Sequence, residues 1–235
     1  MIKLYNDDCM NILPTIEDNS IDLIITSPPY NLGHTHNEST DLDVIYNSYS
    51  DDLTQKEYEK WQINCLNELH RILKPSGLLY YNHKERFKNG YYFNPLNLIQ
   101  KSNFKPLQTI IWHRDGAVNF NIGRFVNCYE TINVAYKSEK YMKINKNSEK
   151  YLDVWKILSS KKKHMIASFP LELPLRIIRS YNDYPNLTVM DCFMGEGTTA
   201  IASQIENRDF IGIEIDKKTF DYAYNRTRTY QTKLI

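Results

Sequence analysis

Short apolar runs of strand length alternate with longer segments of helical periodicity along most of this chain, and this alternation constrains the fold more than any other feature. Apolar runs typical of buried strands occur at 2–5, 22–26, 78–81, 108–112, 131–136, 188–190 and 210–215. Helical spacing is clearest over 54–73 and is also found over 169–181, 198–206 and 217–230. The pattern predicts an α/β fold with a mostly parallel, twisted sheet and helices on both faces.

Length and composition are those of a single globular domain spanning residues 1–235. The chain is 42% apolar and 24% charged, so it can bury a core. It has no apolar run near the roughly 18 residues that a membrane span needs, and its start lacks the layout of a signal peptide. We therefore expect a cytoplasmic protein without a membrane partner. The four cysteines are widely spaced without a C-x-x-C pair, which argues against a zinc site or a disulfide framework.

Charge is unevenly distributed along the chain despite a formal net charge of +1. The segment 137–163 carries nine lysines against three acids, whereas 31–59 carries seven acids against one lysine. A basic segment in a neutral protein is typical of a surface that contacts phosphates. A solvated, lysine-rich loop is the alternative reading of the same residues.

A glycine-containing turn follows the apolar run at 188–190. Its sequence, Asp191-Cys192-Phe193-Met194-Gly195-Glu196-Gly197-Thr198-Thr199, is neither G-x-G-x-x-G nor a P-loop. Gly195 and Gly197 allow the backbone to approach a ligand closely. Glu214 lies roughly 20 residues further on, where dinucleotide folds place an acid that binds ribose hydroxyls. The pattern favours a nucleotide-like cofactor without a pyrophosphate, although a plain tight turn would look similar.

A second motif, Ser27-Pro28-Pro29-Tyr30, follows the run at 22–26. Consecutive prolines stiffen the loop and present carbonyl acceptors. The Ser27 side chain and the Pro28 carbonyl could hold an exocyclic amine of a nucleic-acid base, and Tyr30 could stack on that base once it has left the helix. Such chemistry needs orientation rather than a metal or a covalent nucleophile. Taken alone, Pro-Pro-Tyr is also an ordinary loop or a polyproline ligand.

Together the two motifs resemble the S-adenosylmethionine (SAM)-dependent DNA amino-methyltransferases that modify cytosine N4 or adenine N6. The likeness extends over Asp8-Cys9, Arg71–Leu78, the segment Arg124–Lys137 with Glu130, and His164 followed by Phe169–Pro174. Because the Ser27 motif precedes the glycine loop, the order resembles the β group of that family, a circular permutation of the Rossmann-like methyltransferase fold.

The resemblance implies roles for individual residues. Phe193, Gly195, Gly197 and Thr198 would line the methionine end of SAM, with Asp191 and Thr199 in the same cofactor-binding loop. Glu214 would bind the ribose, and Asp8 with Cys9 would lie near the adenine. Ser27, Pro28, Pro29 and Tyr30 would form the catalytic pocket for the target base.

The sequence also departs from the family pattern. Cys192 stands where the family usually has proline, and the basic segment at about 137–163, the expected DNA-recognition region, is short. A mobile acidic loop at about 31–50 or a second subunit would then help to read double-stranded DNA. The recognition sequence, a homodimer and a cognate restriction endonuclease stay open at this point.

The identity of the target base follows from Ser27. Family members that act on adenine mostly carry aspartate at this position, and Ser-Pro-Pro-Tyr is commoner among cytosine-N4 enzymes. We therefore expect N4 methylation of cytosine, with adenine N6 as the alternative. Deamination and cytosine C5 methylation fit poorly, because the chain has neither the zinc pattern of deaminases nor a cysteine after proline. An RNA or protein-glutamine methyltransferase, a silent DNA-binding paralogue and an NAD-dependent dehydrogenase are the weaker alternatives.

Overall fold

The fold is taken from a computed structural model, which describes residues 1–31, 52–88, 90–114, 123, 125, 127–148, 152–158 and 169–233. The expected loop at 31–50 therefore lies outside the described residues from Leu32 onward. His164, Arg124 and parts of the segment 137–163 also lie outside them.

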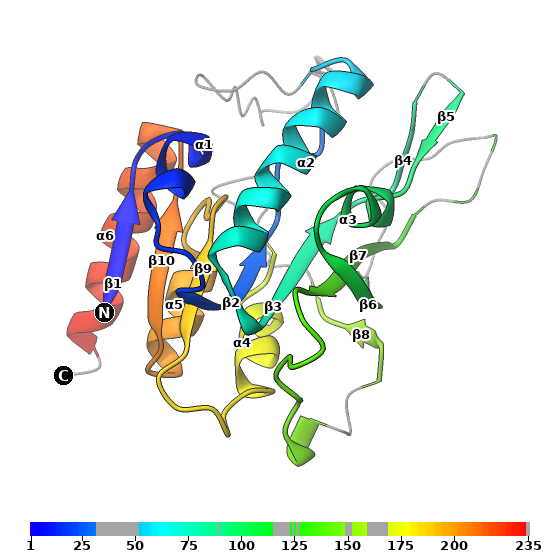
Figure 1. Cartoon of the computed structure of the whole chain (residues 1–235). Helices are drawn as coiled ribbons and strands as arrows, with labels where there is room; N and C mark the ends of the chain where they lie inside the picture. The colour runs from blue at the N-terminus through cyan, green and yellow to red at the C-terminus, as the bar shows by residue number, and fades with distance from the viewer. Residues whose placement is uncertain are drawn as a thin grey trace.

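An eight-stranded sheet forms the centre of the molecule (Figure 1). Its strands lie in the order β1-β10-β9-β2-β3-β7-β6-β8. The first five positions are mutually parallel, and only β7 runs against its neighbours. The bounds are β1 (Ile2–Tyr5), β2 (Ile21–Thr26), β3 (Leu73–His83), β6 (Lys105–His113), β7 (Tyr129–Tyr136), β8 (Val154–Lys156), β9 (Thr188–Asp191) and β10 (Asp209–Ile213). The mostly parallel sheet predicted from the sequence is confirmed.

Helices cover both faces of this sheet, because successive side chains of each strand point to opposite faces. Leu23 of β2 packs in one buried cluster with α4 (Glu172–Arg179), α5 (Thr198–Ile205) and α6 (Lys217–Lys233). Ile24 packs in the other cluster with α1 (Cys9–Ile12), α2 (Gln55–Ile72) and α3 (Leu96–Lys101). Helix α5 is buried along almost its whole length, from Thr198 to Gln204. The doubly covered α/β architecture expected from the sequence is confirmed.

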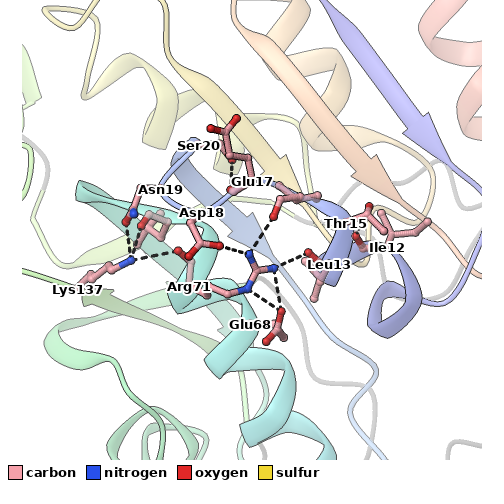
Figure 2. Close-up of polar contacts among 12 residues, drawn as sticks. Ile12, Leu13, Thr15, Glu17, Asp18, Asn19, Ser20, Glu68, Arg71 and Lys137 are labelled. Atoms are coloured by element: carbon pink, nitrogen blue, oxygen red, sulfur yellow. Dashed lines mark hydrogen bonds and ion pairs between the residues drawn. The ribbon is translucent and has the colours of Figure 1, made fainter.

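The α2 helix shows how the sequence sets an element and its ends. Thr54 and Glu57 form a reciprocal capping box at the start of the helix, and Tyr58 and Leu69 lie on its buried stripe. At its other end the Arg71 guanidinium donates to the carbonyls of Leu13 and Ile16 and pairs with acids on either side (Figure 2). This contact fixes the end of α2 against the segment that leads into β2.

Several elements differ from the sequence prediction in extent. Strand β3 starts at Leu73, directly after α2, because Leu73 already pairs with Ile21 before a bulge. Strand β10 ends at Ile213, so Glu214 is the first residue beyond the strand rather than part of it. The pattern did not indicate the short elements α1, α3, β8, the 3-10 turns η1 (Leu13–Thr15) and η2 (Lys146–Ser148), or the hairpin of β4 (Arg86–Lys88) and β5 (Tyr91–Phe93). Runs of three or four residues carry too little periodicity to be recognised.

The basic segment divides between two ends of the sheet. Residues 137–148 leave the end of β7 and lie beside the amino end of β3, where the Met142 amide donates to the Ser76 carbonyl. There the Lys137 ammonium donates to the Asn19 side chain and to the carbonyls of Arg71 and Leu73 (Figure 2). Residues 152–158 return along β6 toward its carboxyl end. Among the described residues of the segment, 152–158 are therefore the ones that lie toward the edge of the sheet where the two motifs lie. None of the described helices is long and apolar enough to cross a membrane.

Candidate active site

The glycine loop begins at the carboxyl end of β9 and leads directly into α5. Gly195 and Gly197 have φ of 51° and 75°, in the left-handed region that favours glycine, and Gly197 is the residue that precedes the helix. An added Cβ at Gly197 would also lie 3.2 Å from the Ala223 Cβ on α6. Both glycines are therefore required by the backbone of the turn, and Gly197 is also required for its close packing against α6.

Asp191 organises this loop from beneath. One carboxylate oxygen accepts from the Thr199 hydroxyl at 2.7 Å, and the other accepts from the Phe193 amide at 3.1 Å. The side chain is fully buried, and burial raises its pKa to about 6. Asp191 was expected among the cofactor-binding residues. Because the residue is only 1% exposed, we assign it a positioning role rather than direct contact with a ligand.

A hydrogen bond links the two sequence motifs. The Thr26 hydroxyl, at the end of β2, donates to Asp191 at 2.8 Å and lies 3.5 Å from the Cys192 sulfur. Strands β2 and β9 are adjacent and parallel, so their carboxyl ends meet at the same edge. The structure thus brings together two loops that are about 165 residues apart in the chain.

Glu214 closes the other side of the glycine loop. Its carboxylate accepts from the Gly195 amide at 3.0 Å and from the Asp216 amide at 2.9 Å. A carboxylate has about four acceptor positions, so Glu214 keeps capacity for the hydroxyls of a ribose. Burial raises the pKa of this carboxyl, and the two backbone donors oppose that shift. The donor and acceptor set fits a nucleoside at this position.

The expected adenine-proximal residues lie beside the same loop. The backbone amide of Glu214 donates to the Tyr5 carbonyl of β1, which places the β1–α1 connection next to the end of β10. Asp8 lies in that connection and caps α1 by accepting from the Met10 amide at 2.8 Å. Cys9 is buried, so its thiol packs into the core. Cys65 and Cys192 are buried too, as expected for small apolar thiols.

The Ser27 loop is held by contacts that leave one carbonyl available. Arg86 donates to the Tyr30 carbonyl, and the Tyr58 hydroxyl lies 2.9 Å from the Pro29 carbonyl oxygen. No described residue donates a hydrogen bond to the Pro28 carbonyl. Pro28 was the expected backbone acceptor for a target amine, and these contacts are compatible with that expectation.

A buried polar network surrounds the Ser27 side chain, and the sequence did not reveal it. The Tyr30 hydroxyl donates to Glu130 at 3.0 Å and lies 2.9 Å from the Ser27 hydroxyl. The Asn82 amide donates to Tyr30 at 2.9 Å and to Glu130 at 3.0 Å, and it lies 3.3 Å from Ser27. Arg114 pairs with Glu130 at 2.9 Å. Asn82 ends the apolar run at 78–81, and a polar residue at the carboxyl end of a parallel strand was the one available signal.

Proton counting gives this network a direction. The one hydroxyl proton of Tyr30 goes to Glu130, so the Tyr30 oxygen accepts from Ser27. Burial and the Glu130 charge hold the pKa of Tyr30 well above its usual range, so it stays protonated. The chain of donors thus runs from Ser27 through Tyr30 to Glu130. The Ser27 oxygen accepts from the Asn82 amide at 3.3 Å and keeps its second lone pair as an acceptor.

The Tyr30 ring is less open than expected for a stacking platform. His83 stacks against it with ring centroids 4.5 Å apart and an interplanar angle of 28°. Burial lowers the pKa of His83 to about 3, so this ring is neutral. One face of Tyr30 is therefore occupied, and at most the other can meet a base. The Nδ1 of His83 lies 2.8 Å from the Lys84 carbonyl oxygen, and its Nε2 lies 2.6 Å from the Tyr58 hydroxyl.

Comparisons with known proteins agree with the fold and the paired motifs. The profile of the DNA methylase family that includes the N6 and N4 enzymes matches residues 21–225, so the chain belongs to this SAM-dependent DNA amino-methyltransferase family. It is 30% identical to the type II methyltransferase M.BglII of Bacillus subtilis, covering 94% of this chain and 68% of that protein. The type II methyltransferase M.HinfI of Haemophilus influenzae is also 30% identical, over 96% of this chain and 68% of its own length.

Solved structures show the same fold. The cytosine-N4-specific PvuII DNA methyltransferase superposes with a TM-score of 0.77 at 19% identity, covering 98% of this chain and 90% of that one. A DNA modification methylase of Thermus thermophilus, solved with SAM, gives a TM-score of 0.71 at 24% identity over 98% of this chain and 94% of that one. The predicted Rossmann-like methyltransferase fold is thereby confirmed.

Proposed function

We propose that this chain transfers the SAM methyl group to N4 of cytosine in double-stranded DNA, at a short recognition site. The observation that carries the proposal is the orientation of Ser27, whose hydroxyl donates into the Tyr30–Glu130 chain and leaves its own oxygen as an acceptor. Aspartate is the usual residue at this position in adenine-specific relatives, so the serine favours cytosine. The fold likeness to a cytosine-N4 enzyme supports the fold rather than the base.

In this proposal the residues of the pocket orient the amine and do not attack it. The Ser27 oxygen and the Pro28 carbonyl each accept one N–H of the exocyclic amine. Holding both hydrogens draws the nitrogen away from planarity and frees its lone pair, which conjugation otherwise removes. SAM, when bound, supplies the electrophilic methyl group. Orientation of this kind can contribute several kcal/mol to lowering a barrier.

The residues of the glycine loop and its neighbours hold the cofactor. Phe193, Gly195, Gly197 and Thr198 face the methionine end, while Glu214 accepts from the ribose hydroxyls and the Asp8 connection borders the adenine. Asp191 and Thr199 fix the loop from below, with Thr26 joining it to the target pocket. Trp61 meets Phe193 edge to face with ring centroids 5.8 Å apart, and this partly buried pair extends the apolar wall of the same site.

DNA recognition completes the proposal. Because residues 137–148 lie at the opposite edge of the sheet, we assign the DNA contact of the segment 137–163 to its second part; the described residues there, 152–158, hold one lysine, Lys156, and one acid, Asp153. The short length of this region supports a homodimer in which the second copy helps to read the site. The type II names of the relatives also suggest a cognate restriction endonuclease. Sedimentation with and without DNA tests the dimer directly.

The base is tested by sequencing DNA from cells that express the protein, with a method that separates N4-methylcytosine from N6-methyladenine. We expect N4-methylcytosine within one short sequence. Methylation of adenine alone would overturn the cytosine assignment and leave the family unaffected.

The role of Ser27 is tested by Ser27→Ala. The loss of an oriented acceptor should lower the methyl-transfer rate by roughly 100-fold, the effect of removing one well-placed hydrogen-bonding group, while the SAM dissociation constant stays within about twofold. Ser20→Ala is the matched control, because its exposed hydroxyl bonds only to the Glu17 carbonyl far from the site. A wild-type rate in Ser27→Ala would contradict the proposal.

A further inference from the structure

The β4–β5 hairpin lies beyond the carboxyl end of β3, at the edge of the sheet where the two motifs lie (Figure 1). Two residues separate the end of β3 from the start of β4, and the hairpin forms its own two-stranded sheet, apart from the main one. Two strands of three residues each cannot bury a core. The hairpin is therefore too small to be explained as a structural unit by itself.

Its inner face is attached firmly to the catalytic loop. Arg86 donates to the Tyr30 carbonyl and, at 2.6 Å, to the Gln55 side chain at the start of α2. The Arg86 guanidinium also lies over the rings of Tyr58 and Phe93, 4.7 and 4.3 Å from their centroids. A cavity of about 260 Å³ lies beneath these contacts, between the hairpin and the start of α2. The hairpin thus has a defined position relative to the Ser27 loop.

Its outer face carries a pair of exposed aromatic side chains. Phe87 and Tyr92 are directly opposite each other in the antiparallel register, so both point to the same side of the ribbon. Phe87 is 47% exposed and Tyr92 is 54% exposed. Two large rings side by side at the surface, next to a site that acts on a base, form a contact surface rather than a scattered pair of apolar residues.

We propose that the Phe87–Tyr92 face binds double-stranded DNA beside the target nucleotide, stacking on the bases left unpaired or unstacked when the target base leaves the helix. This goes beyond the proposed function, which assigns no role to the hairpin, but it rests on methylation of DNA. A two-stranded ribbon has the dimensions of the major groove. Aromatic and apolar side chains are used by other proteins to wedge into or stack on disturbed base steps.

Charge and area both favour DNA over a second copy of the chain. The segment 84–93 holds three basic residues (Lys84, Arg86 and Lys88) against one acid, and of these Arg86 is buried on the inner face. That acid, Glu85, is bonded by the hydroxyls of Tyr129, at 2.7 Å, and of Tyr92, so the segment keeps a net positive charge from Lys84 and Lys88. Two half-exposed rings of roughly 150–250 Å² each fall far short of the roughly 1,200 Å² that a stable protein interface buries.

The first test measures DNA and cofactor binding separately. In Phe87→Ala/Tyr92→Ala, the KM for unmethylated plasmid DNA should rise at least tenfold, the size expected for loss of base stacking, while the SAM dissociation constant stays unchanged. The single variant Tyr92→Phe keeps the ring and should have the wild-type KM for DNA. Tyr224→Ala, which removes a 42% exposed tyrosine from α6, is the matched control. An unchanged KM in the double variant would overturn the proposal.

The second test uses the wild-type protein and so does not depend on the variant folding. Duplexes of the mapped recognition site carry 5-iododeoxyuridine next to the target base, and irradiation links the base to a neighbouring aromatic ring. Mass spectrometry should locate the adduct within residues 86–93. Adducts found only outside residues 86–93 would overturn the proposal. It would also be overturned if the Phe87→Ala/Tyr92→Ala variant no longer formed dimers but kept the wild-type KM for DNA. Failure of the wild-type chain to methylate any DNA would instead contradict the proposed function.

Discussion

Replacement of Glu130 by glutamine tests whether the buried network sets the direction of Ser27. Glu130 accepts from Tyr30 and Asn82 and pairs with Arg114 at 2.9 Å, with side chains that are only 8% and 21% exposed. Glu130→Gln keeps the shape but removes the charge. It leaves a mostly buried guanidinium without its counter-ion, and that guanidinium already has a buried Nε with no partner among the described residues.

The expected loss of stability follows from that unpaired charge. Breaking a buried ion pair from one side costs about 3–5 kcal/mol, and the partial exposure of Arg114 favours the lower value of about 3 kcal/mol. In a chain of this length the midpoint of thermal unfolding should fall by roughly 6–12 °C. The matched control is Glu139→Gln. Its pair with Lys105 at 3.3 Å is exposed, so the expected change is below about 1 kcal/mol.

The catalytic effect is measured below the unfolding temperature of both variants. Without the carboxylate, the Tyr30 hydroxyl loses its charged acceptor. The hydrogen bond between Ser27 and Tyr30 can then reverse, so that Tyr30 donates to the Ser27 oxygen. Loss of a hydrogen bond to a charged group, about 1.5–3 kcal/mol, corresponds to a roughly 10- to 100-fold lower kcat. Tritiated SAM and plasmid DNA give kcat, and calorimetry gives SAM affinity, which should not change. If Glu130→Gln matched Glu139→Gln in stability and in kcat, the directed network would be refuted.

Two further predictions concern the cofactor loop. Glu214→Gln should weaken SAM binding by roughly tenfold, because hydroxyl groups donate more strongly to a carboxylate than to an amide; an unchanged dissociation constant in calorimetry would contradict its role. Asp191 has a folded-state pKa of about 6, above the value of 3.8 for an unperturbed side chain, so the folded protein binds more protons than the unfolded chain between those values. The stability due to this group should therefore fall by about 2 kcal/mol as pH rises from 4 to 6, out of about 3 kcal/mol over its whole titration. Denaturant unfolding should show that fall in the wild type relative to Asp191→Asn, and parallel pH curves would exclude it.

The accuracy of the sequence prediction depended on how local each signal was. The strand at 188–191, the turn at Gly195 and Gly197 and the long α2 helix are encoded by neighbouring residues, and they were predicted with small errors at their ends. The SAM-dependent family and the Rossmann-like fold followed from two such local motifs. Separate local motifs also allowed Glu214 to be placed near the glycine loop, where its carboxylate indeed meets the Gly195 amide.

Features that depend on contacts between distant residues were missed. Asn82 meets Ser27 because β2 and β3 are neighbours, and Glu130 meets Asn82 because β3 and β7 pair in antiparallel register, which brings Asn82 opposite Ile132. Lys137 belongs to a lysine-rich run, yet its ammonium is used to cap carbonyls at the end of α2, since β7 delivers it to that edge. Local composition cannot distinguish a lysine that binds phosphate from one that is bonded within the fold.

The order of the two motifs in the chain should matter less than their meeting in space. Thr26 and Asp191 are joined through neighbouring strands, while α6 runs back from the carboxyl end of β10, and Figure 1 shows the end of α6 on the same side of the molecule as β1. A permutant that links Lys233 to Met1 and opens between Pro185 and Asn186, two exposed residues ahead of β9, would place the glycine loop first.

We expect that permutant to bind SAM and to methylate DNA within about tenfold of the wild type, because new termini in exposed loops are tolerated when the buried contacts persist. The control permutant opens between Thr26 and Ser27. It separates the target loop from its strand and should lose methyl transfer. Activity in the control, or loss of SAM binding in the first permutant, would show that chain continuity rather than the Thr26–Asp191 junction holds the site together.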